Sequence, residues 1–542
     1  MKKILLSWAV LFSALSLQAQ EARISPSMRK AMDAIDTNTI RGHIAYLADD
    51  KLLGRMPGQP GYDMAADYVI DHFKKLGLQP AGDAGSFKQK LTLRRSTLQK
   101  NSLHLWLSDA NGNIDSLSSR TDLAVSPHPL KPSVDLRDAP LVFAGYGVDI
   151  PGKHSDYTNL DVKGKVVVVL RTAPEGLTST YNSHFGNVGY KMELAKSKGA
   201  IGLIVVSPAP SPFFAGPPTV TNSVSPDKSA AYGSRYIGNL DLYINGSYSL
   251  LQSIFLQSGK NLKQVIADLK AGKTQSFDLG KKISASFKTS YNDIETYNVI
   301  GMIPGTDAKL KSEYVVHTAH LDHIGVARAA NPVNEDSIFN GAHDNASGVA
   351  SLMEIARLYK TSGAKPKRSI LITMVSAEES GLLGSAYFAS NPSVPKSAVV
   401  ANVNTDMPVI IAPCNSVIPL GAQHSTMMKH VQFATSALNL QIEEDPEPQE
   451  NFFVRSDQYS FVREHIPAVH IKTGRKSNIP GFDLNAYVKA WRAKYYHKPE
   501  DQLEGGLFHF GAAKTYIQVN FLTSYSVAMD PNRPKWNDGE LF

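Results

Sequence analysis

The chain has 542 residues, of which 42% are hydrophobic, and this is enough material for two or more buried cores. Its formal net charge of +7 comes from scattered basic residues rather than a basic run or arm, a pattern that argues against nucleic-acid binding. The single cysteine, Cys414, excludes a disulfide within the chain.

The first twenty residues have the pattern of a bacterial secretory signal peptide. Two lysines precede a short apolar stretch, and the small residue Ala19 follows it. The stretch is short for a bilayer span, and no later segment is long and apolar enough to cross a membrane. We therefore expect residues 1–20 to be cleaved and the protein to be exported to the periplasm or the medium, without a stable membrane span.

The next part of the chain predicts helices followed by strands. Residues 38–79 carry apolar side chains at helical spacing on both sides of a Gly- and Pro-rich turn at 54–61. Residues 21–130 are therefore assigned to the N-terminal part of the main domain. From residue 131, strand-like runs such as GKVVVVLR alternate with short helices and proline-rich loop, without clustered acids or histidines. Residues 131–285 thus indicate an inserted domain with no catalytic centre of its own.

The remaining residues, 286–542, repeat the order strand, loop, helix. Apolar strands are predicted in YVVHTAHLD, SILITMVSAEES and AVVANVNTDM, and a helix is predicted in GVASLMEIARLY. This alternation is typical of an α/β fold in which helices cover both faces of a central sheet.

Each of these three strands ends in residues that can bind a metal. They end, in chain order, in His320 and Asp322, in Glu378 and Glu379, and in Asp406. Open α/β sheets form their sites beyond the carboxyl ends of strands, and histidine with carboxylates is a ligand set for divalent metals. A single acid at a strand end is more often a cap or a solvated loop residue, but three such ends together favour a metal site.

The loop GAHDNASG, residues 341–348, enters the predicted helix. Asp344, Asn345 or Ser347 could simply cap that helix. A two-metal site, however, needs a ligand that bridges ions about 3.5–4 Å apart, which a carboxylate can do and a neutral imidazole cannot. In such a site Asp344 can bridge and His343 cannot.

The neighbouring glutamates, Glu378 and Glu379, suggest a division of roles. One can ligate a metal while the other takes a proton from the attacking water as general base. The alternative is an exposed acidic start of a helix. The GLLGS that follows makes a generic surface turn less favourable, because small residues permit close packing.

Six motifs in this order resemble the co-catalytic zinc exopeptidases of metallopeptidase family 28 (clan MH). They are AHLDHIG, GAHDNASG, SAEESGLLGS, NTDM, RSDQYSF and YHKPED. The stretch AGYGV…KGKVVVV…AKSKGAIGLIVV is similar to the protease-associated (PA) domain inserted in many members, including bacterial aminopeptidases. The resemblance implies a mixed central sheet flanked by helices, with an inserted β-rich PA domain at 131–285.

The resemblance also implies two zinc ions and their ligands. These are His320 and Asp406 for one ion, Glu379 and His497 for the other, and Asp344 as the bridge. His497 rests on the resemblance alone, because a lone histidine in a polar loop is more often a surface or core residue. In relatives the peptide bond after the bridging aspartate is often cis, so a cis Asp344–Asn345 bond is also implied.

Further roles follow from the matched motifs. Glu378 would be the general base, and Asp322 would lie behind His320 and fix its tautomer. His343, Asp457, Gln458 and Tyr459 are candidate substrate contacts. Many members have an acid or asparagine in place of His343, and many have histidine in place of Gln458.

The sequence therefore predicts an exported di-zinc aminopeptidase that hydrolyses N-terminal residues from peptides with a zinc-bound hydroxide. A carboxypeptidase would need basic residues, such as Arg455 or Arg475, near the substrate carboxylate. The insert counts against a glutaminyl-cyclase-like member, and the complete set of ligands counts against a catalytically inactive binding protein. The substrate side-chain preference, the role of the insert and the oligomeric state stay open.

Overall fold

A computed structural model describes most of the chain, and the predicted signal peptide lies outside the described residues. Among the helices that are described, none has both the length and the apolar character needed to cross a membrane. The described residues are 22–117, 122–213, 218–233, 240–327 and 336–542.

The C-terminal half is built on a mixed sheet, as the resemblance implies. Its strands are, in spatial order, β14 (Ser276–Ile303), β18 (Ser369–Val375), β15 (Tyr314–His320), β19 (Val399–Asn404), β22 (Ala468–Thr473), β20 (Ser416–Leu420) and β21 (Gln441–Ile442). The four central strands, β18, β15, β19 and β22, are parallel, whereas β14 pairs antiparallel with β18 and β20 pairs antiparallel with β22. The carboxyl ends of the central strands therefore meet at one edge of the sheet.

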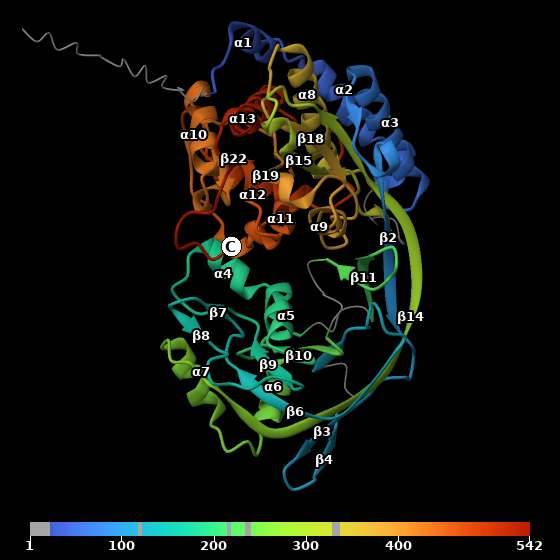
Figure 1. Ribbon diagram of the computed structural model, residues 1–542, viewed down its shortest axis with the longest axis vertical. Helices are drawn as coiled ribbons and strands as arrows, with labels where there is room; N and C mark the ends of the chain where they lie inside the picture. The colour runs from blue at the N-terminus through green and yellow to red at the C-terminus, as the bar shows by residue number, and fades with distance from the viewer. Residues whose placement is uncertain (1–21, 118–121, 214–217, 234–239, 328–335) are drawn as a thin grey trace, which may run out of the picture.

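Helices cover both faces of this sheet, which confirms the predicted α/β arrangement (Figure 1). The helices of this part are α1 (Pro26–Asp33), α2 (Thr37–Leu47), α3 (Pro60–Leu76), α8 (Ser347–Thr361), α9 (Leu383–Ser390), α10 (Met427–Leu438), α11 (Gln458–Arg463), α12 (Leu484–Tyr495) and α13 (Phe510–Met529). Along β15, Val315 and Ala319 pack into the core that contains α2, α3, α8 and α13, while Val316 packs into the core that contains α9 and α11. Strand residues thus alternate between two buried faces, which explains the continuous apolar run.

The insert forms a second sheet with its own core. Its strands are, in spatial order, β4 (Ile114–Ser116), β3 (His104–Asp109), the first part of β14, β6 (Ser133–Ala144), β9 (Val166–Leu170), β10 (Gly202–Val206), β13 (Leu242–Gly246) and β5 (Leu123–Val125). Its helices are α4 (Ser179–Gly186), α5 (Val188–Ser197), α6 (Tyr248–Phe255) and α7 (Leu262–Lys270), and a short hairpin joins β7 (Asp149–Ile150) to β8 (His154–Ser155).

The predicted limits of the insert, 131 and 285, cut through this second core. The core takes in Leu105 and Val125 upstream of residue 131, and Phe287 downstream of residue 285. The change of composition at residue 131 coincides with the start of the apolar strand β6, whereas β3 and β5 of the same sheet lie before it. The hydrophobic core of the second sheet therefore extends beyond both predicted limits.

One continuous strand joins the two sheets. The 28 residues of β14 pair with β6 at the start of the strand and with β18 at its end, and β2 (Lys88–Leu98) runs beside the middle of β14. In Figure 1 this long strand curves along one side of the molecule. The strands β1 (Gln79–Pro80), β11 (Thr219–Val224) and β12 (Ala231–Tyr232) extend the ribbon. The insert is thus held by a hydrogen-bonded ribbon.

The insert also touches the main domain on the opposite side, through α4. Ser183 donates a hydrogen bond of 2.8 Å to the side-chain oxygen of Asn451, and the Thr180 hydroxyl lies 2.6 Å from Nε2 of His424. With the ribbon on one side and these contacts on the other, the two parts enclose a space between them.

Candidate metal centre and catalytic site

The structure brings all five predicted ligands together at the carboxyl edge of the central strands. His320 ends β15, Glu379 follows β18, and Asp406 follows β19. Asp344 lies in the turn Ala342–Ala346 that leads into α8, and His497 follows α12. The bond between Asp344 and Asn345 is cis, as expected.

Two histidines share the carboxylate of Asp344. Nε2 of His320 lies 3.1 Å from Oδ1 of Asp344 and 3.2 Å from Oδ1 of Asp406. Nε2 of His497 lies 3.2 Å from Oδ2 of Asp344 and 3.1 Å from Oε2 of Glu379. The two oxygens of Asp344 therefore belong to two adjacent groups, each completed by one histidine and one further carboxylate.

These separations suit a metal better than hydrogen bonds. An imidazole Nε2 carries at most one hydrogen, so it cannot serve two carboxylate oxygens equally. In a tetrahedral site with zinc–ligand distances of about 2.0–2.1 Å, neighbouring ligand atoms lie about 3.3 Å apart. Ligand atoms of His320, Asp344 and Glu379 lie within 4.8 Å of one another. The donor set, which combines imidazole nitrogen and carboxylate oxygen, fits zinc.

The pKa values of the cluster also show that its buried carboxylates favour neighbouring positive charge. Burial disfavours the charged form of Asp344, but its contacts with His320 and His497 hold its pKa well below the usual value. Burial likewise opposes protonation of His497, yet Asp344 and Glu379 raise its pKa to about 10. The buried carboxylates thus stabilise cations at the two positions that metals would occupy.

Glu378 lies beside the cluster and differs from its neighbour, Glu379. Burial, together with the charges of Asp406 and Glu379, raises the pKa of Glu378 well above its usual value, against the opposing effect of His320. Glu379 instead accepts a hydrogen bond of 2.7 Å from Nδ1 of His323, which is on the loop after β15. The two adjacent glutamates therefore lie in different environments: that of Glu378 favours the protonated form, whereas Glu379 contacts histidines at the site.

Asp322 supports the site in a different way from the prediction. The acceptor nearest to Nδ1 of His320 is the backbone oxygen of Asp322, at 3.1 Å, whereas its carboxylate Oδ1 lies 3.9 Å away. The carboxylate accepts backbone hydrogen bonds from Glu378 and Glu379, at 3.2 and 3.4 Å. The main chain of Asp322 thus fixes the imidazole, and its side chain holds the turn that carries the two glutamates.

Asp501 holds the loop of Asp344 in the same way, and no individual role was predicted for this residue. Its carboxylate accepts hydrogen bonds from the backbone nitrogens of His343, at 2.9 Å, and Asp344, at 3.0 Å. Asp501 is fully buried, and burial raises its pKa to about 6. Its position in the YHKPED motif, four residues after His497, was the only available signal.

Arg55 is a second supporting residue that the sequence did not indicate. Its guanidinium is buried and donates to four backbone oxygens, those of Leu47, Leu321, Asn340 and Gly341. Three of these oxygens lie beside the ligands: Leu321 directly follows His320, and Asn340 and Gly341 lead into the turn that carries Asp344. A residue from the N-terminal part of the chain thus ties together the segments on either side of the site.

The four candidate substrate contacts are buried supports. His343 donates from Nε2 to the backbone oxygen of Gly506 and stacks on Phe508. Gln458 donates to the backbone of Phe453, and the Tyr459 hydroxyl lies 3.0 Å from Nδ1 of His184 in the insert. Asp457 is also buried, which raises its pKa to about 7. None of these four side chains lines either of the two cavities at the site, because their elements turn them into the core.

The site opens into a cleft between the main domain and the insert, with a volume of about 800 Å³. Glu378, Glu379 and His497 line it on one side, and Arg171 and Tyr243 of the insert line it on the other. The insert therefore forms a wall of the space through which a substrate reaches the cluster.

A second, smaller cavity of about 120 Å³ adjoins the cleft, since Arg455 and Tyr496 line both. We call it the side pocket. It is lined by Asp406, Met407, Val409, Phe452, Lys472 and Trp491, among others. Residues of the cluster thus line both a roomy cleft and a small pocket.

Comparison with known proteins agrees with this arrangement. Residues 298–509 match the model of peptidase family M28, and residues 137–233 match that of the PA domain. A probable zinc metalloprotease of Pyricularia oryzae is 37% identical over 112 residues, covering 20% of this chain and 21% of that protein. Leupeptin-inactivating enzyme 1 of Streptomyces exfoliatus is 28% identical over 172 residues, covering 30% of this chain and 35% of that protein.

Among solved structures, the chain is similar to an aminopeptidase from Aneurinibacillus sp. strain AM-1, with a TM-score of 0.47 and 18% identity. That alignment covers 93% of this chain and 97% of the other. The chain spans only about a fifth to a third of the length of the two curated relatives.

Replacing Arg55 with lysine should lower the free energy of unfolding by about 2–4 kcal/mol, because an ammonium cannot reach four carbonyls held in the fork of a guanidinium. Urea denaturation of the two proteins measures the difference. Arg29→Lys, at an exposed position on α1, is the control and should change little. Equal stability of Arg55→Lys and the unmodified protein would contradict the role given to Arg55.

Replacing Asp501 with asparagine should weaken zinc binding by about 10- to 100-fold, because an amide presents a donor to one of the two backbone N–H groups around Asp344. Competition with a chromogenic chelator measures the affinity. Glu504→Gln, on an exposed side chain three residues away, should leave it unchanged. An unaltered affinity in Asp501→Asn would show that the loop of Asp344 needs no such support.

Proposed function

We propose that the chain is an exported di-zinc aminopeptidase that removes N-terminal residues from peptides, a function supported by the match of residues 298–509 to the model of peptidase family M28. The observation that carries the proposal is the carboxylate of Asp344, which is shared between two groups, each with one histidine and one more carboxylate. Export rests on the pattern of the first twenty residues.

Each of the two groups supplies the ligands for one zinc ion. His320 and Asp406 would hold the first ion, Glu379 and His497 would hold the second, and Asp344 would bridge them. Two zinc ions would carry four positive charges, and the three carboxylates carry three negative ones. The buried cluster would thus be within one charge of neutrality, which limits the cost of its desolvation. Zinc, when bound, supplies a Lewis acid that polarises the scissile carbonyl and acidifies water.

Glu378 performs the proton transfers. Its carboxylate takes a proton from the attacking water and passes it to the nitrogen of the leaving amine. Burial raises the pKa of Glu378, which makes its carboxylate a stronger proton acceptor than a solvated glutamate. Glu378 also lines the cleft, so it is accessible to a substrate that lies there.

The two cavities favour removal of a terminal residue. The side pocket, at about 120 Å³, has room for one side chain, whereas the cleft, at about 800 Å³, can hold the rest of a peptide. With the N-terminal side chain in the side pocket and the rest of the peptide in the cleft, the cluster would cleave the peptide bond after the first residue. Basic residues in that pocket, Lys472 and Arg475, make a carboxypeptidase the second candidate, because they could also bind a terminal carboxylate.

Replacing Glu378 with glutamine should lower kcat for leucine p-nitroanilide by about 10²–10⁴-fold while the bound zinc stays the same, because the amide cannot accept the proton. Steady-state kinetics and elemental analysis of the same samples measure both quantities. Glu444→Gln, at an exposed position, is the matched control. A variant Glu378→Gln with near wild-type turnover would remove Glu378 from the proposed mechanism.

Removing the metal with a chelator should abolish the hydrolysis, and about two equivalents of zinc per chain should restore it. The reason is that both groups around Asp344 need a cation to offset their buried carboxylates. Titration of the metal-free protein with zinc, followed by activity, gives the number of ions. Full activity in a protein without metal would refute the proposal, and restoration at one equivalent would refute the two-ion site.

A further inference from the structure

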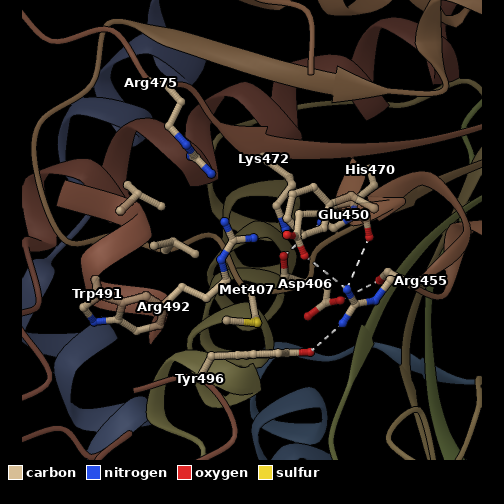
Figure 2. Close-up of a pocket in the computed structure, with 14 residues that line it drawn as sticks. Asp406, Met407, Glu450, Arg455, His470, Lys472, Arg475, Trp491, Arg492 and Tyr496 are labelled. Atoms are coloured by element: carbon tan, nitrogen blue, oxygen red, sulfur yellow. Dashed lines mark hydrogen bonds and ion pairs between the residues drawn. The ribbon is translucent and has the colours of Figure 1, made fainter. Parts of the chain in front are cut away.

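The side pocket combines apolar walls with several basic groups. Val409, Val488, Trp491 and Phe452 supply apolar surface. Figure 2 shows Asp406 at the pocket together with Lys472, Arg475 and Arg492. Its volume of about 120 Å³ is several times the roughly 10–15 Å³ that a single water needs. The pocket therefore has room for a side chain rather than one ordered water.

Three arginines at the pocket are paired with two glutamates. Arg475 and Arg492 both contact the buried carboxylate of Glu447. Arg455 lies 3.7 Å from the carboxylate of Glu450 and donates to its backbone oxygen. Two further carboxylates lie near these guanidinium groups: Glu443 accepts a hydrogen bond from the backbone nitrogen of Arg475, and Asp445 interacts electrostatically with Arg475 and Lys472. The three arginines are therefore balanced by acidic groups of the chain.

Lys472 adds a further positive charge with no partner of its own. This lysine is on β22, is 9% exposed, and lines the pocket. In the described part of the chain its ammonium makes no hydrogen bond or ion pair, and it lies 5.0 Å from the centre of the Phe452 ring. Burial lowers its pKa to about 8, while Asp406 has the opposite effect, so the group is still mostly charged at neutral pH.

An unpaired buried ammonium is costly unless an anion joins it. The nearby carboxylate of Asp406 accepts a hydrogen bond of 2.6 Å from Ser456 and faces His320, so it belongs to the metal cluster. Among the described residues, Lys472 is thus a cation of the pocket with no carboxylate in direct contact, and a carboxylate of a ligand could pair with it.

We propose that the side pocket binds a carboxylate of the substrate, carried by the side chain of an N-terminal glutamate or aspartate, with Lys472 as its main cation. This inference rests on the proposed aminopeptidase function and adds a substrate class to it. The apolar walls contact the methylene groups, and the ammonium of Lys472 receives the carboxylate. The same charge repels an N-terminal lysine or arginine side chain.

The same chemistry could bind the C-terminal carboxylate of a peptide, and the two sources are separated by the substrate. The α-p-nitroanilides of glutamate, glutamine and leucine carry a free amine and no C-terminal carboxylate. N-acetylated dipeptides, tested as free acids and as amides, carry a C-terminal carboxylate and no free amine.

In the first arm, kcat/KM for the glutamate anilide should exceed that for the glutamine anilide by about tenfold or more, since the two differ mainly in charge. Lys472→Met should lower this ratio by about 10- to 100-fold, the effect expected for a hydrogen bond to a charged group. Lys489→Met makes the same change of charge at an exposed position on α12 and should leave the ratio unchanged.

The outcomes separate the two proposals. Cleavage of the leucine and glutamine anilides with no preference for glutamate overturns the pocket assignment and leaves the aminopeptidase in place. Cleavage of the N-acetylated free acids alone, with sensitivity to Lys472→Met, moves the carboxylate to the C-terminus and overturns the assignment to the N-terminal side chain. No cleavage of any substrate counts against the aminopeptidase itself.

Calorimetry then decides the pocket independently of turnover, with L-glutamate and L-glutamine as probes. Tighter binding of L-glutamate by about tenfold, lost in Lys472→Met and kept in Lys489→Met, supports the proposal. Equal binding of the two amino acids overturns it. If Lys472→Met does not fold, the comparison of the two probes on the unmodified protein gives the answer.

Discussion

The carboxylate of Asp344 faces two histidines at once, and the surroundings of the site serve to hold it there. Each oxygen has its own imidazole, at 3.1 Å for His320 and 3.2 Å for His497, so a small rotation of the side chain would break one contact. The backbone before this side chain is fixed by Asp501 on one side and by Arg55 on the other. Buried carboxylates need donors, and here the supporting ones take backbone N–H groups, which leaves the imidazoles free for metal.

The ligands at the strand ends could be predicted because parallel strands bring their carboxyl ends to one edge of the sheet. Asp406, which follows β19, was found from this rule alone. His497 could not be found in this way. It follows α12 in a loop and has a positive φ of 55°, so no periodic pattern places it. Arg55 is far upstream of the ligands and donates only to backbone oxygens. Because every residue has such an oxygen, the sequence contains no pattern that predicts these contacts. Tyr459 shows the opposite error, because closeness to a motif suggested substrate contact and α11 instead turns its ring toward the insert.

The insert could be predicted from its apolar, strand-like runs and its lack of clustered acids and histidines, but the extent of its core and its role depend on the fold. Its core takes residues from before 131 and after 285, because β14 runs without a break from one sheet into the other. A strand that belongs to two sheets has no boundary for composition to detect. The same continuity, together with the contacts of α4, places Arg171 and Tyr243 across the cleft from Glu378. The insert therefore shapes access to the site although it has none of the ligands.

The two cavities meet the cluster with different chemistry, and this asymmetry ties the reaction to the choice of substrate. The cleft is bordered by Glu378, which exchanges protons, and by His497, whose side chain is 36% exposed. The side pocket is bordered by Asp406 and contains the unpaired charge of Lys472. A substrate carboxylate there would offset a cost that the folded chain otherwise carries alone. Binding energy gained from that side chain would position the neighbouring carbonyl at the cluster, so selectivity and rate would depend on the same contact.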